Sequence, residues 1–209
     1  MPLDSGFLRK LKPGLCKHEG VRDYFYRDSV GQVTIGVGHL VRTETDATRL
    51  HLARRDDHKP ATIAEIAAAF NAVKNEPFKH TGVKDHKTHV WGSSHYLGLK
   101  GAGNIFMPPG EVDRLLDRHI AEFYRNLQLS FSVKQGYKRD FDAFPENVRL
   151  ALFDMIFNLG PTKFPWHWPA LVKALKAENW HEAARQSRRP QLSADRNKYV
   201  HDLFTSAGR

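Results

Sequence analysis

The stretch that decides the fold reads KHEG at residues 17–20 and YFYRDSVGQVTIGVGH at residues 24–39. Asp28 and Gly31 stand at the first and last positions of a four-residue turn, where a type I turn favours these residue types. After the turn, valine and isoleucine alternate with more polar residues, which is the period of a half-buried strand. The stretch therefore predicts a β-hairpin with Asp28 at its turn. Thr34 is expected on the strand face opposite the valines, where it and Asp28 face a common cleft floor.

A short helix is predicted to end at Glu19. Leu11 and Leu15 have helical spacing, and Gly20 is typical of the residue that follows a helix C-terminus. The negative end of a helix dipole disfavours a charged carboxylate. This environment suits a general acid, which must carry a proton near neutral pH. Taken alone, however, Glu19 would be interpreted as a solvated helix end and Asp28 as a turn residue.

Together these residues form the pattern H-E-G…Y-x-D-x-x-G-x-x-T-I-G-x-G-H, which is similar to the catalytic signature of the phage-type lysozymes (endolysins). The resemblance implies that Glu19 is the general acid, that Asp28 positions or activates water, and that Thr34 assists Asp28. It gives His39 a structural or peripheral role. The implied fold is α+β and mostly helical. In it a long helix joins a small hairpin lobe to a helical lobe, and the active site lies in the cleft between them.

The composition of the 209 residues is that of a globular protein, with a formal net charge of +9. This charge predicts attraction to polyanions such as nucleic acid, anionic lipid or an anionic cell wall. No nucleic-acid-binding motif accompanies it, so nucleic acid is the weaker option. The single cysteine, Cys16, excludes an intrachain disulfide and is expected to be a small buried residue.

The beginning of the chain lacks the basic start and apolar core of a signal peptide, and no apolar run is long enough to span a bilayer. We expect a monomer that is made in the cytoplasm, does not insert into the membrane, and reaches the cell wall through a phage holin or a bacterial secretion system. The start and the insertion described below favour a bacterial antibacterial effector, or its lysozyme domain, over a phage endolysin. An effector would imply an immunity protein as a partner, besides peptidoglycan glycan strands.

The segment after the hairpin has no counterpart in the resemblance. A capping box at Thr62–Glu65 predicts a helix, and the chain then becomes irregular. We interpret residues 43–107 as an insertion in a hairpin lobe of residues 16–107, with residues 1–15 and 108–209 forming the helical lobe and the connecting helix. The insertion contains His80, His86, His89 and His95. No carboxylate or cysteine completes a zinc site with them, so neither a metal nor another cofactor is predicted.

Several helices are predicted after Pro108-Pro109-Gly110. The segment from Pro145 to Gly160 is apolar on nearly all sides, which is typical of a central bundle helix. Its end, FNLG at residues 157–160, resembles the F-N-x-G of the same lysozymes. Asn158 is therefore expected either to line the cleft or to make a structural hydrogen bond. The aromatic residues at 164–169 are expected to pack between helices rather than to bind sugar.

The last helix is predicted to begin near Ser193 and to carry Arg196 close to its start. The resemblance implies that Arg196 pairs with Glu19 from across the cleft, the alternative being a surface arginine. One departure precedes this helix. Where the family usually has R-W-x, the chain has Arg188-Arg189-Pro190, so one aromatic packing element is missing.

The resemblance implies hydrolysis of the β-1,4 bond between N-acetylmuramic acid and N-acetylglucosamine in peptidoglycan. Inversion requires the two carboxyl groups to be about 6.5–9.5 Å apart, whereas a separation of about 5 Å is typical of retention. A lytic transglycosylase acting on the same bond is the chemical alternative, and it would not need Asp28. A non-catalytic peptidoglycan-binding module and a nucleic-acid binder are the alternatives from other classes.

Overall fold

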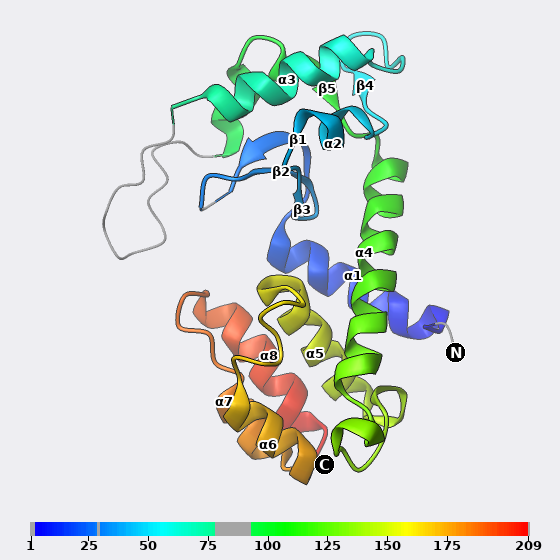
Figure 1. The fold of residues 1–209 in the computed structure, drawn as a ribbon, viewed down its shortest axis with the longest axis vertical. Coiled ribbons are helices and arrows are strands. Elements are labelled where there is room, and N and C mark those ends of the chain that lie inside the picture. The colour runs from blue at the N-terminus through cyan, green and yellow to red at the C-terminus, as the bar shows by residue number, and fades with distance from the viewer. Residues whose placement is uncertain (1–2, 29, 78–92, 209) are drawn as a thin grey trace. The chain divides into compact units, whose positions relative to one another are not determined.

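The structure, a computed structural model, describes residues 3–28, 30–77 and 93–208. Over these residues the chain is mostly helical, with small antiparallel sheets, which confirms the predicted α+β class (Figure 1). The chain divides into two compact units. Unit 1 contains Met1–Glu19 and His119–Arg209, and unit 2 contains Gly20–Arg118. These boundaries differ from residues 16 and 107, where the sequence analysis placed them.

The predicted hairpin forms the first sheet of unit 2. It consists of β1 (Arg22–Arg27), β2 (Val33–Gly36) and β3 (His39–Leu40), which are antiparallel neighbours in that order. Tyr26 lies opposite Thr34 in the β1–β2 pair. The hairpin prediction is therefore confirmed for the described residues, and Ser29 of its turn lies outside them.

Strand β2 is buried at all four positions, including Thr34 at 4% exposure, so the prediction of a half-buried strand is wrong. One close contact of this strand is at Gly36, which has a φ of +68°. A β-carbon added there would lie 3.3 Å from Cδ2 of Leu115, on helix α4 (Pro109–Ser130), which begins in unit 2. The group that approaches this glycine closely is therefore the protein's own core.

The segment interpreted as an insertion supplies much of the core of unit 2. It forms α2 (Glu44–Thr48), β4 (Ala53–Arg54), α3 (Ile63–Asn75), the 3₁₀ helices η1 (Ser93–Gly98) and η2 (Ala102–Asn104), and β5 (Ile105–Phe106), which pairs with β4. The predicted capping box of α3 is confirmed at Thr62. Phe70 of α3 packs on Phe25 of β1 with ring centroids 6.0 Å apart. The segment is thus an integral part of the unit.

The histidines of this segment are described only in part. His80, His86 and His89 lie outside the described residues. His95 is described, and its Nε2 lies 2.8 Å from Oε1 of Glu76.

Unit 1 is built around a central helix, as the sequence predicts. Helix α5 (Glu146–Leu159) is buried over most of its length and contacts both α1 (Ser5–Glu19) and α8 (Ala194–Ser206). The remaining elements of the unit are the end of α4, the 3₁₀ helices η3 (Val133–Gln135) and η4 (Phe141–Ala143), α6 (Pro169–Ala177) and α7 (Trp180–Gln186). Among the described residues, no helix combines the length and apolarity needed to cross a membrane.

The aromatic residues of the turn at residues 164–169 lie in two different environments. Phe164 is buried and packs against Phe131 and Trp168, as predicted. Trp166 is exposed over 62% of its surface, so for this residue the expected packing between helices is wrong.

The contact at Gly36 generates a prediction about stability. Changing Gly36→Ala places a methyl group against Leu115 at a backbone conformation that disfavours a side chain. We expect the free energy of unfolding to fall by about 2–3 kcal/mol. Gly98→Ala is the matched control, because nothing lies within 4 Å of its added methyl group. In urea denaturation, equal effects of the two changes would contradict the assignment of Gly36 to a packed core.

Candidate active site

Glu19 is the last residue of α1, as predicted, and Gly20 follows it with a φ of +73°. Arg196 approaches Glu19 from the first turn of α8, which Ser193 caps by accepting the backbone N–H of Arg196. Arg196 Nη2 lies 2.5 Å from Glu19 Oε1. The predicted ion pair is therefore confirmed. Both residues belong to unit 1, so the expected pairing from across a cleft between two lobes is replaced by a pair within one unit.

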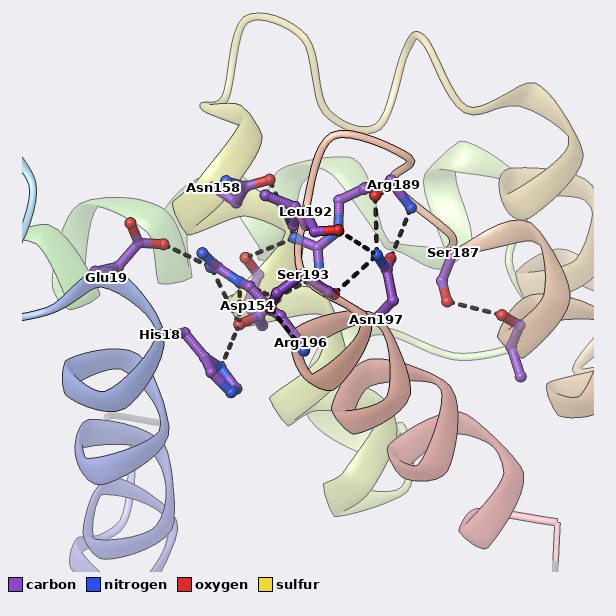
Figure 2. A network of polar contacts seen from close by, with 11 residues as sticks. His18, Glu19, Asp154, Asn158, Ser187, Arg189, Leu192, Ser193, Arg196 and Asn197 are labelled. Carbon is purple, nitrogen blue, oxygen red and sulfur yellow. Dashed lines mark hydrogen bonds and ion pairs between the residues drawn. The ribbon is translucent and has the colours of Figure 1, made fainter. Parts of the chain in front are cut away.

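The ion pair is the accessible end of a larger buried ionic cluster, which Figure 2 shows. Its members are His18, Glu19, Asp154, Arg189 and Arg196. Asp154 stands at its centre on α5: its carboxylate lies 2.6 Å from Arg189 Nη2, 3.2 Å from Arg196 Nη2 and 3.1 Å from His18 Nδ1. The side chains of Asp154 and Arg189 are almost fully buried, whereas Glu19 keeps 18% of its side chain exposed.

The charges of this cluster compensate one another. Burial by itself raises the pKa of Asp154, but the guanidinium groups of Arg196 and Arg189 outweigh it, so the pKa is lowered and the carboxylate stays ionised. Burial also lowers the pKa of Arg196, yet the carboxylates of Glu19 and Asp154 raise it above its ordinary value. Arg196 is therefore a permanent cation that divides its hydrogen bonds between two carboxylates.

Arg189 lies in the segment Arg188-Arg189-Pro190, which departs from the resemblance described above. Its side chain is fully buried, and Nη1 donates to Oδ1 of Asn158 at 3.2 Å. Of the two roles expected for Asn158, this contact supports the structural hydrogen bond. Arg189 also forms an ion pair with Asp154.

Arg189 and Asp154 were not predicted from the sequence as members of the site. A signal was present, because Asp154 interrupts a helix that is otherwise apolar on nearly all sides. A charged residue in a buried helix requires a partner of opposite charge. The residue that supplies this partner, however, could not be chosen among the many arginines of the chain.

The turn of the hairpin orients Asp28 in unit 2. Its Oδ1 accepts hydrogen bonds from the backbone N–H groups of Val30 and Gln32, each at 2.9 Å. The N–H of Gly31 donates to the Asp28 carbonyl at 3.0 Å, which closes the predicted four-residue turn. In the described part of the chain, Oδ2 of Asp28 has no hydrogen-bond partner. The carboxylate is therefore held by one oxygen and presents the other.

Thr34 does not share an open face with Asp28, because its side chain is buried. The prediction of a common cleft floor is wrong on this point. The structure connects the two residues through Gln32 instead. The carbonyl of Gln32 accepts both the hydroxyl of Thr34 at 3.2 Å and the backbone N–H of Asp28 at 2.9 Å. Thr34 thus supports the turn that orients Asp28.

Two further predicted residues are peripheral to these contacts. His39 is half-buried on β3, opposite Ile35 of β2. Cys16 of α1 is half-buried, so the expectation of a fully buried residue is wrong.

Comparisons with known proteins add no family to this description. No protein-family model matches the chain, and no match is found among curated proteins. Functional proposals therefore depend on the chain's own residues. In unit 1 a partly exposed carboxylic acid is held by a buried arginine, and in unit 2 a second carboxylate is held by backbone amides.

The buried ionic cluster generates a prediction about stability. Asp154→Asn would leave Arg189 and Arg196 without their shared counter-charge in the interior of unit 1. We expect the free energy of unfolding to fall by about 3–5 kcal/mol. Asp202→Asn is the matched control, since Asp202 is exposed and its loss should change stability by about 0.5 kcal/mol or less.

The lowered pKa of Asp154 also predicts how the effect of Asp154→Asn on the free energy of unfolding depends on pH. The pKa of Asp154 is lowered in the folded protein, so its contribution to stability is present above the ordinary pKa of about 3.9 and is lost as the pH falls through the folded value. The difference in unfolding free energy between wild type and Asp154→Asn should therefore shrink below about pH 4. A difference that stays constant from pH 7 to pH 3 in urea titrations would refute the ionised state of Asp154.

Proposed function

We propose that the protein is a muramidase with a lysozyme-like fold, which hydrolyses the β-1,4 bond between N-acetylmuramic acid and N-acetylglucosamine in peptidoglycan. The observation that carries the proposal is the ion pair between Glu19 and Arg196. It joins the acid of the lysozyme-like motif to an arginine 177 positions away, which the resemblance identified in advance. Glu19 remains partly exposed, whereas its partner Arg196 is buried. A catalytic acid must be accessible to its substrate, and the exposure of Glu19 meets this requirement.

The contacts of Glu19 support its role as the general acid. The protonated carboxyl group donates its proton to the glycosidic oxygen that leaves, and Glu19 becomes a carboxylate. Arg196 lies 2.5 Å from Glu19 Oε1, so a fixed positive charge stabilises the negative charge that forms during the transfer. Because Asp154 also binds Arg196, the guanidinium need not turn when Glu19 changes its protonation state.

The contacts of Asp28 support its role in directing water. Two backbone N–H groups fix Oδ1, and Oδ2 is left to accept a proton from a water molecule. The water then attacks the anomeric carbon while the leaving oxygen takes the proton of Glu19. If the two groups act on opposite faces of the sugar, the product has inverted configuration. The net charge of +9 supports attraction to an anionic cell wall as the place of action.

The first test of the proposal is the digestion of purified peptidoglycan. We expect Glu19→Gln and Asp28→Asn each to lower the rate of wall solubilisation about 10²–10⁴-fold, because each removes a proton-transfer group. The matched controls, Glu122→Gln and Asp113→Asn, remove exposed carboxylates and should digest at the wild-type rate. Equal rates of digestion by all five proteins would overturn the assignment of Glu19 and Asp28, and no digestion by the wild type would leave only a binding module.

Product masses separate hydrolysis from the transglycosylase alternative. A hydrolase leaves a reducing muramic acid, whereas a transglycosylase leaves an anhydro sugar that is lighter by one water. Detection of the anhydro product, together with full activity of Asp28→Asn, would replace the muramidase by the transglycosylase.

A second test concerns Thr34, which acts as a positioning residue through Gln32. Thr34→Val removes the hydroxyl that donates to the Gln32 carbonyl, and we expect kcat to fall about five- to tenfold with little change in KM. Thr34→Ser keeps the hydroxyl and should restore most of kcat. If valine and serine lower kcat equally, the effect comes from packing and not from the hydrogen bond.

A further inference from the structure

Two neighbouring residues fasten the end of α1 to the rest of unit 1. His18 and Glu19 both extend from its last turn toward the buried ionic cluster (Figure 2). Glu19 is bound by Arg196 of α8. Nδ1 of His18 lies 3.1 Å from Oδ2 of Asp154, which belongs to α5. Each of the two residues is therefore held by a different helix, and both contacts determine where the carboxyl group of Glu19 lies.

The two contacts respond differently when Glu19 carries a proton. A general acid must be protonated before it acts, and a protonated carboxyl group has no negative charge to attract the guanidinium of Arg196. Against the effect of burial, the charges of Arg196 and Arg189 lower the pKa of Asp154, and its carboxylate stays ionised. A hydrogen bond to an ionised acceptor is roughly twice as strong as one between neutral groups. The contact between His18 and Asp154 therefore keeps its strength in the form of the enzyme that reacts.

The surroundings of His18 fix which ring nitrogen donates. An ionised carboxylate can only accept hydrogen bonds, so the nitrogen that faces Asp154, Nδ1, must carry the hydrogen. Among the described residues, Nδ1 is also the ring nitrogen that has a hydrogen-bond partner. The imidazole meets the ring of Tyr199 on α8 edge-on, with centroids 4.6 Å apart, and only 9% of the His18 side chain is exposed. The imidazole is therefore held in one orientation, with its donor directed at Asp154.

We propose that His18 is a positioning residue of the reaction, which keeps the protonated Glu19 in place by donating its Nδ1–H to Asp154. The inference rests on the proposed function, because it requires Glu19 to act as a general acid. In this role His18 transfers no proton and need not touch the sugar. Its effect on the rate is large, because a misplacement of about 1 Å at a reacting group can lower the rate about 10²-fold.

The test compares two changes of His18 in the digestion of soluble, uncrosslinked glycan strands. His18→Leu removes the donor, and we expect kcat to fall about ten- to hundredfold while KM changes by about twofold or less. The reason is that the position of Glu19 affects the transition state and not the binding of the strand. His18→Asn carries an amide N–H close to the position of Nδ1, so this variant should restore most of kcat.

Phe7→Leu is the matched control. Phe7 belongs to the same helix but lies near its other end, where its ring packs on Phe153 of α5 with centroids 5.8 Å apart. The change loosens the packing of α1 on α5 without touching the donor of His18. We expect it to lower the free energy of unfolding in urea denaturation and to leave kcat at the wild-type value.

Nitrogen-15 NMR at neutral pH gives a readout that does not depend on activity. The imidazole signals that are missing in His18→Asn belong to His18, and in the wild type they should show a hydrogen on Nδ1. A hydrogen on Nε2 alone would overturn the proposal, because Nδ1 could then not donate to Asp154.

Two kinetic results would also overturn it: equal losses of kcat in His18→Leu and His18→Asn, or a loss in Phe7→Leu as large as that in His18→Leu. Digestion by the wild type separates this failure from that of the proposed function. If the wild type digests the strands and His18→Leu keeps its kcat, the role of His18 is overturned and the muramidase stands. If the wild type digests no strands, the muramidase proposal fails and the role of His18 fails with it.

Discussion

Unit 1 depends on the placement of one buried carboxylate between two arginines. Asp154 lies in the interior on α5, where an unpaired charge would be very unfavourable. Arg189 and Arg196 compensate it, and Arg196 extends a further hydrogen bond to Glu19. Because α1, α5 and α8 each supply a member of this cluster, the helices cannot shift against one another without breaking it. The position of Glu19 is therefore a consequence of how the helices pack.

Unit 2 orients its carboxylate by different means. Asp28 has no cationic partner in the described residues, and backbone N–H groups of its own turn hold one oxygen. Such a turn is stable locally, and Thr34 connects it to the buried strand through Gln32. The two carboxylates consequently differ in their surroundings. Glu19 faces the guanidinium group of Arg196, whereas Asp28 faces polar but uncharged donors.

The sequence predicted features whose cause is local. The capping box at Thr62, the turn at Asp28 and the glycine after Glu19 each depend on a few neighbouring residues, and each is confirmed. Arg196 was found through the resemblance. Features that depend on distant residues were missed. Thr34 was expected on an open face because alternation along a strand does not reveal which distant residues cover that face. Residues 43–107 were interpreted as an insertion because a missing match in sequence carries no information about which core the residues join.

Stability alone gives no reason for the buried ionic cluster. Well-packed apolar residues of similar volume often stabilise an interior as well as a buried ion pair does, or better. Apolar side chains cannot, however, hold a guanidinium group in one direction. Asp154 binds Arg196 through Nε and Nη2, and the same Nη2 meets Glu19, so the orientation of Arg196 is fixed from the interior before any substrate is present. With Glu19 ionised, the two carboxylates and the two arginines of the cluster carry no net charge, and loss of Arg189 would leave one negative charge uncompensated in the interior. Arg189 and the charged residue in the central helix are therefore one feature, which fixes the direction in which Arg196 meets Glu19.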